Sequence, residues 1–134
     1  MINVVQTKEL LISTSNRLGL LLEISQLLSN EGFSIEAISA HAARNFALIG
    51  IITNDNARAM TILASHDYVV EENNVLVLEV DHKPGALKQI TKALEEGKID
   101  IINIYGGAIS DCDKGILVFS TTDNQQAFSV LKSL

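Results

Sequence analysis

The sequence predicts an α+β protein made of two βαββαβ units side by side, each with an antiparallel sheet that carries its helices on one face. Two observations predict this fold class. The second half of the chain repeats the first, and strand-like patterns alternate with apolar stripes at helical spacing. Gly19 falls on Gly85 when the sequence is shifted by 66 positions. The apolar residues that follow also match: Leu21, Ile24 and Leu28 fall on Leu87, Ile90 and Leu94.

The match continues after two extra residues in the second copy. Residues 53–56 then align with 121–124, and 59–63 with 127–131. An ordered series of matches over most of the chain is typical of a duplication. We therefore place a first domain at residues 1–73 and a second domain at residues 74–134.

Each unit begins with a strand rich in β-branched residues and leucine, expected at 8–14 and 75–81. A short polar turn with a glycine follows, and then a helix with apolar residues on one side. Gly32 and Gly97 stand where these helices should end, since glycine is common just past a helix C-terminus. The apolar positions are Leu20, Leu21, Ile24, Leu27 and Leu28 in the first copy and Ala86, Leu87, Ile90, Ala93 and Leu94 in the second.

Two strands, a helix and a closing strand complete the unit. Strands are predicted at 35–42 and 46–53 in the first copy, and at 100–109 and 115–121 in the second. Asp55 and Asp123 are expected to begin the second helices, where a carboxylate accepts hydrogen bonds from free backbone N–H groups. The first copy closes with a strand at 68–72, whereas the second reaches Leu134 without one.

The N-terminal residues are a candidate for the missing strand. Val4-Val5-Gln6 precedes the strand at 8–14 much as Val69-Val70-Glu71 precedes the strand at 75–81. We expect residues 2–6 to complete the sheet of the second domain, in the same chain or in a partner chain. The alternative is a frayed N-terminus. The βαββαβ order is that of the ferredoxin-like fold, which hosts many functions.

Composition excludes several functional classes. Ten Lys and Arg residues against sixteen Asp and Glu residues give a net charge of −6, which argues against a nucleic-acid-binding protein. No apolar run approaches the roughly 20 residues of a membrane helix. The N-terminus lacks the features of a signal peptide, and Cys112 is the single cysteine, so we expect a cytoplasmic protein without an intrachain disulfide.

No catalytic motif is found. The sequence has neither a Gly-x-Ser-x-Gly nucleophile motif nor a Walker-type phosphate loop. His41, His66 and His82 lack the spacing of metal ligands. A small hydrolase such as an acylphosphatase would need an arginine and an asparagine around a phosphate loop, and no such set can be assembled. We therefore expect no enzymatic activity, no metal and no cofactor.

The two strand-to-helix turns reduce the number of functions that this fold could serve. Asn16-Arg17-Leu18-Gly19-Leu20-Leu21 and His82-Lys83-Pro84-Gly85-Ala86-Leu87 resemble the Asn-x-Pro-Gly-x-Leu turn of ACT domains. Gly32-Phe33-Ser34-Ile35-Glu36 is similar to the segment of that family that enters the second strand. Leu18 replaces the usual proline, and His82 and Ser34 replace the usual asparagines. The resemblance covers essentially the whole chain and implies tandem ACT domains with no catalytic domain attached.

The resemblance implies a regulatory protein that binds a small molecule at its inter-domain clefts. In this family the small molecule is in most cases an amino acid. The first N–H groups of a helix can hold a carboxylate, and glycine lets a ligand approach the backbone. Pro84 is expected at the first helical position. The implied ligand-binding residues are Asn16, Arg17, Leu18, Gly19, Leu20, Ser34, His82, Lys83, Pro84, Gly85, Ala86 and Asp100.

The resemblance and the chemistry assign roles within this set. Ser34 and Asp100 occupy the position that often reaches a ligand held by the neighbouring domain, and the Asn16 oxygen can accept a hydrogen bond from an α-amino group. Arg17 and Lys83 recur in the two turns and either steer an anionic group or are simply solvated. A structural alternative stays open, in which Asn16 and Asp81 cap helices and the glycines only make tight turns.

Apolar strands predict an association surface. Residues 48–52, 75–78 and 116–119 do not alternate apolar with polar, as is typical of strands buried on both faces. Because helices cover one face only, the other face should meet a second copy of the chain. The sequence therefore predicts a homodimer.

The sequence leaves two candidate functions. The first is an amino-acid-binding regulatory protein whose bound ligand modulates a partner or a pathway. The second is a regulatory subunit of a biosynthetic enzyme, with ligand sites that no longer function. Leu22 favours the second, because an apolar residue stands with Ser25, Gln26 and Ser29 on the polar side of its helix.

Overall fold

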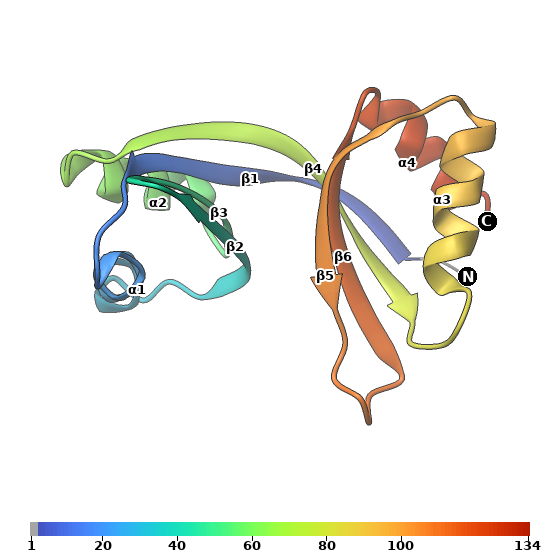
Figure 1. Ribbon diagram of the computed structural model, residues 1–134, viewed down its shortest axis with the longest axis horizontal. Helices are drawn as coiled ribbons and strands as arrows, with labels where there is room; N and C mark the ends of the chain where they lie inside the picture. The colour runs from blue at the N-terminus through green and yellow to red at the C-terminus, as the bar shows by residue number, and fades with distance from the viewer. Residues whose placement is uncertain (1–2) are drawn as a thin grey trace. The chain divides into compact units, whose positions relative to one another are not determined.

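The computed structural model describes residues 3–134, so Ile2 of the expected strand at 2–6 lies outside the described residues. These residues form six strands and four helices (Figure 1). The strands are β1 (Asn3–Ser15), β2 (Ile35–Ala43), β3 (Phe46–Thr53), β4 (Val69–Asp81), β5 (Ile101–Gly107) and β6 (Lys114–Thr121). The helices are α1 (Leu20–Asn30), α2 (Asn56–Ser65), α3 (Ala86–Glu96) and α4 (Asn124–Lys132).

The chain divides into two compact units. The N-terminal unit is Lys8–Asn73, and the C-terminal unit joins residues 3–7 to Asn74–Leu134. Hydrogen-bonded strands run β2-β3-β1-β4 in the first and β5-β6-β4-β1 in the second. The α+β class with two ferredoxin-like units is therefore confirmed.

Two long strands serve both units. The predicted strands at 68–72 and 75–81 form the single 13-residue strand β4, and β1 likewise runs for 13 residues through the region predicted as two strands. No glycine or proline stands in either junction, so the backbone stays extended. Residues 3–7 of β1 thus lie beside β4 in the C-terminal unit, and Val4 is buried in that unit's core.

The N-terminal unit packs α1 and α2 on one face of its sheet. Alternate residues of β1 and β3 face these helices, as a pleated strand requires. Leu21, expected on the apolar stripe of α1, is instead 44% exposed. The core consists of Leu10, Ile12, Leu20, Ile24, Leu28, Phe33, Ala47, Ile49, Ile51, Ala59 and Leu63.

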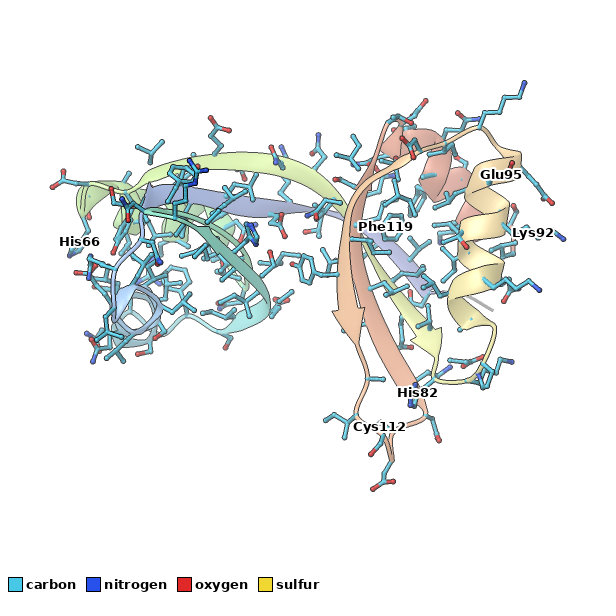
Figure 2. The ribbon with its side chains drawn as sticks, in the orientation of Figure 1. His66, His82, Lys92, Glu95, Cys112 and Phe119 are labelled. Carbon is cyan, nitrogen blue, oxygen red and sulfur yellow. The ribbon has the colours of Figure 1, made fainter. Side chains whose placement is uncertain are left out.

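The C-terminal unit repeats this packing with α3 and α4. Phe119 of β6 points into the space between the sheet and the helices (Figure 2). Its N-terminal counterpart is Ile51, which takes the same place in the ladder beside the first strand of its unit. The core consists of Val4, Leu76, Leu78, Ile90, Leu94, Ile99, Phe119, Ala127 and Leu131.

The second helix of each unit starts in the same hydrogen-bonded arrangement. Asp55 accepts a hydrogen bond from the Arg58 N–H at 3.2 Å, and Asp123 accepts one from the Gln126 N–H at 3.0 Å. Both aspartates are the N-cap residues of α2 and α4, as the sequence predicts. The duplication therefore extends to the capping interactions.

The helix-free face of each sheet carries exposed apolar side chains. Leu48 in the N-terminal unit is 41% exposed, and Val5 and Ile116 in the C-terminal unit are 50% and 42% exposed. Neighbouring residues along each strand pack in the helix-side cores, so alternation directs these three side chains to the opposite face. Exposed apolar surfaces of this kind are typical of binding sites, and the homodimer stays a prediction.

Within residues 3–134 no helix is long and apolar enough to cross a membrane. The same residues contain no group of three His, Cys, Asp or Glu side chains that could hold a metal ion. Cys112 is exposed in the loop between β5 and β6.

Candidate functional site

The first helix of each unit starts from the same backbone geometry. Gly19 precedes α1 with φ 83° and ψ 5°, and Gly85 precedes α3 with φ 90° and ψ −7°. The Leu20 N–H donates to the Arg17 carbonyl and the Ala86 N–H to the Lys83 carbonyl, both at 3.3 Å. These angles fit the third position of a type II turn, where a positive φ favours glycine.

The turn geometry corrects the expected position of Pro84. Helix α3 begins at Ala86, so Pro84 is not the first helical residue. It takes the second position of the turn, for which its fixed φ is suited. Leu18 takes the same position before α1, and its side chain is fully exposed.

No side chain caps α1 or α3 within the described residues. The alternative in which Asn16 and Asp81 cap these helices is therefore wrong. Asp81 instead accepts a hydrogen bond from Lys114 at 2.5 Å and forms an ion pair with Lys83 at 3.8 Å. The Leu20 and Ala86 N–H groups are used by the turns, so the N–H groups that follow them in the first turn of α1 and α3 are the ones that can bind an anion. In α2 and α4 an aspartate occupies one such N–H.

A cavity of about 500 Å³ opens at the turn before α1. We call it the turn cavity. The Asn16 N–H donates to the Asn45 carbonyl at 2.8 Å, which brings the hairpin between β2 and β3 to the turn. Small alanines on these strands leave the space open. The lining residues are Asn16, Arg17, Leu18, Gly19, Leu20, Leu21, Leu22, Ala40, His41, Ala42, Ala47 and Ile49.

The structure brings five predicted residues, Asn16 to Leu20, together on this cavity. Sequence reasoning missed the opposite wall, which β2 and β3 supply. The pairing of Ala42 with Ala47 next to the hairpin was a usable signal, because two small residues facing each other leave a hollow.

Arg17 lines the turn cavity and is held by two other side chains, Glu23 and Tyr68. The Arg17 guanidinium and the Tyr68 hydroxyl both donate to the Glu23 carboxylate, and Arg17 also reaches the Tyr68 hydroxyl at 3.4 Å. The hydrogen bonds from Tyr68 and Arg17 lower the pKa of Glu23. Burial and the hydrogen bond to Glu23 raise the pKa of Tyr68. Glu23 therefore stays ionised at neutral pH and holds Arg17 beside the start of α1.

The turn before α3 has a different setting. Its cavity is smaller, about 180 Å³, and Lys83 and Ala86 are the predicted site residues among those that line it. His82 donates its backbone N–H to the Asp113 carbonyl at 2.8 Å. Gln89 stands where the first unit has Glu23, so no carboxylate at that place holds the Lys83 side chain.

Ser34 and Asp100 lie away from the turn of their own unit. Each precedes an edge strand at the end of the sheet opposite the β2–β3 or β5–β6 hairpin. The Ser34 N–H donates to Asn54 Oδ1 at 2.9 Å, and the Asp100 N–H donates to Thr122 Oγ1 at 3.1 Å. Neither residue lines the turn cavity or the smaller cavity at the second turn.

Solved structures share this architecture. Protein BT0572 from Bacteroides thetaiotaomicron is 22% identical with a TM-score of 0.90, over 97% of this chain and 89% of that chain. The ligand-free regulatory subunit of aspartate kinase from Thermus thermophilus is 12% identical with a TM-score of 0.70, over 98% and 92%. Aspartokinase III from E. coli, in complex with aspartate and ADP, is 19% identical with a TM-score of 0.64, over 98% and 32%. These likenesses show the fold.

No curated protein sequence matches this chain. The family model of the ACT domain pair matches residues 5–133. This match spans both glycine turns and all four helices described above. The chain therefore belongs to the ACT domain pair family, as the resemblance of its two turns predicted.

Proposed function

We propose that this protein is a regulatory protein that binds an amino acid in the turn cavity and catalyses no reaction. The bound amino acid changes the affinity of the protein for a partner. The observation that carries the proposal is an uncapped helix N-terminus in the wall of a cavity of about 500 Å³, beside a fixed arginine. The family supports it, and so does an aspartokinase in complex with aspartate, 32% of whose chain shares this fold.

The proposed ligand pose follows from the charges around the turn cavity. The ligand's α-carboxylate faces the Leu21 and Leu22 N–H groups in the first turn of α1 and the Arg17 guanidinium. Gly19 has no side chain in the way of this approach. The Asn16 side-chain oxygen accepts a hydrogen bond from the α-ammonium group. The apolar wall formed by β2 and β3 receives an aliphatic side chain, for which Ala42 and Ala47 leave room.

The turn before α3 is proposed as a weaker site. Lys83 supplies a positive charge there, and Gly85 repeats the geometry of Gly19. The cavity is less than half as large, and Lys83 is paired with Asp81. Ser34 and Asp100 stay proposed contacts to a ligand that a neighbouring domain holds. The homodimer stays a prediction, with exposed Phe46 and Leu48 of the N-terminal unit as its expected contacts.

The proposal is tested by a thermal-shift screen of the twenty amino acids against the full chain. A ligand at a hundredfold excess over its Kd stabilises the folded state by about 2.7 kcal/mol. We expect at least one amino acid to raise the Tm and Arg17→Met to remove most of that rise. Lys83→Met is the matched control and should keep most of it. If none of the twenty amino acids changes the Tm, the proposal is wrong.

A second candidate function is a regulatory subunit of a biosynthetic enzyme with non-functional ligand sites. Three exposed leucines around the turn favour it: Leu18, Leu21 and Leu22 are 102%, 44% and 61% exposed. Exposed apolar side chains gathered in one place are typical of an interaction surface. Affinity purification that returns one enzyme in stoichiometric amount, lost with Leu22→Ser but kept with Arg17→Met, would favour this function over the first.

A further inference from the structure

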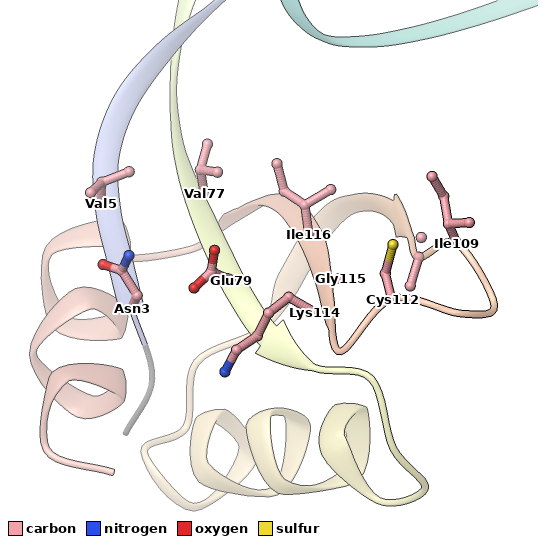
Figure 3. A pocket seen from close by; sticks show the side chains of 11 residues that line it. Asn3, Val5, Val77, Glu79, Ile109, Cys112, Lys114, Gly115 and Ile116 are labelled. Atoms are coloured by element: carbon pink, nitrogen blue, oxygen red, sulfur yellow. The ribbon is translucent and has the colours of Figure 1, made fainter.

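A second large cavity lies on the helix-free face of the C-terminal unit. Its volume is about 480 Å³, and all its lining residues belong to this unit (Figure 3). Val5, Val77 and Ile116 form an apolar floor from three neighbouring strands. The loop between β5 and β6 adds a wall with Ala108, Ile109 and Cys112. We call it the sheet-face cavity, and it shares no residue with the turn cavity.

The hollow exists because one residue has no side chain. Gly107 pairs with Ile116 across the ladder, so a side chain at position 107 would point to the helix-free face. A Cβ built there meets nothing within 4 Å, and its φ lies outside the left-handed region. The matching residue in the first unit is His41, which pairs with Leu48. The second copy therefore differs from the first in a residue that opens this cavity.

Two charged side chains, Glu79 and Lys114, line the sheet-face cavity. The Glu79 carboxylate lies between Val77 and Lys114, and the Lys114 amine points away from the apolar floor (Figure 3). That amine donates to Asp81 at 2.5 Å, and the hydrogen bond and charge of Asp81 raise the pKa of Lys114. Among the described residues, the Glu79 carboxylate forms no ion pair or hydrogen bond of its own. The Glu79 charge also raises the pKa of Lys114, but less than Asp81 does. One ammonium group therefore faces two carboxylates, and a negative charge is left at Glu79 for a ligand.

An apolar cavity with a single available carboxylate selects for a particular chemistry. Ligand cavities of this size are usually apolar, with a few polar groups that orient the ligand. A positive group is attracted to Glu79, whereas a ligand carboxylate would be repelled by it. Asp81 and Asp113, which face the same Lys114 ammonium, add to that repulsion. We propose that the sheet-face cavity binds a small organic ammonium ion with a branched alkyl or aryl body. The body packs on Val5, Val77 and Ile116, and the ammonium group faces Glu79.

This inference does not rest on the proposed function. The turn cavity offers helix N–H groups to a carboxylate, while the sheet-face cavity offers a carboxylate to a cation. An amine that lacks the α-carboxylate therefore belongs in the second cavity, and the corresponding amino acid belongs in the first.

The test is an NMR titration of the full chain with three probes of the same shape. They are 3-methylbutylamine, the neutral 3-methylbutan-1-ol and zwitterionic leucine. We expect the amine to shift the methyl signals of Val5, Val77, Ile109 and Ile116 and to bind about fivefold more tightly than the alcohol, as for one exposed charge pair. Leucine should leave these four signals in place. Equal affinity of amine and alcohol, or shifts elsewhere only, would overturn the proposal.

Two variants locate the site. Glu79→Gln should make the amine bind no better than the alcohol, and Glu95→Gln, an exposed carboxylate on α3 away from the cavity, should leave the fivefold preference intact. Gly107→Leu should abolish binding of both probes by filling the cavity. If that variant melts early, Gly107→Ala replaces it and should weaken both probes, because its methyl group occupies part of the empty space.

Three results contradict the proposal through the variants. They are full amine affinity in the Gly107 variants, an unchanged preference in Glu79→Gln, and shifts of the same methyl signals with protein concentration in the absence of a probe. The last result would assign this face to a second copy of the chain.

Discussion

The turns before α1 and α3 have the same backbone conformation, but different side chains surround them. Gly19 and Gly85 adopt nearly the same backbone angles, and each precedes a helix that no side chain of residues 3–134 caps. Around the first turn, Glu23 and Tyr68 hold an arginine beside a cavity of about 500 Å³. Around the second, the lysine is drawn to Asp81 and the cavity measures about 180 Å³. Duplication kept the local geometry, and the side chains that meet it from distant segments diverged.

The largest expected effects compare the two cores. Phe119 and Ile51 occupy matching, fully buried ladder positions. Phe119→Ala should cost about 3–5 kcal/mol of the free energy of unfolding and Ile51→Ala about 2–5 kcal/mol, because each leaves a cavity in a packed core. Urea unfolding followed by circular dichroism measures both. A loss below about 1 kcal/mol in either variant would contradict the equivalence of the two cores.

The turn glycines are the next comparison. Gly19→Val and Gly85→Val should each cost roughly 1–3 kcal/mol of stability, because a β-branched residue resists a φ of 83° or 90°. The two losses should be similar, while the amino-acid-induced Tm rise should disappear only with Gly19→Val. Gly19→Asn and Gly85→Asn are the matched controls, since asparagine tolerates this conformation better. Unequal losses would show that the turns are not equivalent in energy.

Helix caps distinguish the first helix of each unit from the second. Asp55→Ala and Asp123→Ala should each lower the free energy of unfolding by about 1 kcal/mol, since each aspartate accepts a hydrogen bond from a first-turn N–H. Asn16→Ala and His82→Ala should change it by less than about 0.5 kcal/mol, because neither residue caps a helix. Thermal unfolding of the four variants is the measurement. A cost of Asn16→Ala equal to that of Asp55→Ala would contradict the assignment.

Acid dependence gives the smallest expected effect. Hydrogen bonds from Tyr68 and Arg17 lower the pKa of Glu23, and the hydrogen bond and charge of Lys114 lower the pKa of Asp81. A carboxyl with a lowered folded-state pKa contributes stability above its unfolded-state pKa and loses it as the pH falls through the folded-state pKa. Glu23→Gln and Asp81→Asn should therefore each flatten the fall of the Tm below about pH 4.5.

Salt supplies the control for these acid effects. Both carboxylates are exposed, so added NaCl at about 1 M should shrink the difference between each variant and the original chain. A pH profile of the Tm at low and high salt makes the comparison. An acid dependence that Glu23→Gln leaves unchanged would show that the Arg17–Glu23–Tyr68 contact adds nothing to stability.

Local sequence patterns predicted much of the fold. The caps at Asp55 and Asp123 were predictable because each involves residues three apart in the chain. The first residues of the helices were less predictable. Pro84 was expected inside α3, but the left-handed Gly85 places the start of the helix one residue after itself.

The candidate site was predicted on one side only. Asn16 to Leu20 are contiguous, and their motif identifies them in the sequence. Their opposite wall comes from β2 and β3, and Tyr68 reaches Glu23 across 45 residues. Such contacts depend on strand pairing and register, which no local pattern specifies.

The sequence by itself determined the duplication, the order of elements and the two glycine turns, because periodicity, capping and turn preferences act over a few residues. Only the tertiary structure decided that β1 and β4 each run through both units and that the first turn opens onto a large cavity. It also decided that Gly107 leaves a hollow on the helix-free face of the C-terminal unit. Those features arise where segments far apart in the chain pack together, so their shape depends on the side chains that both segments bring.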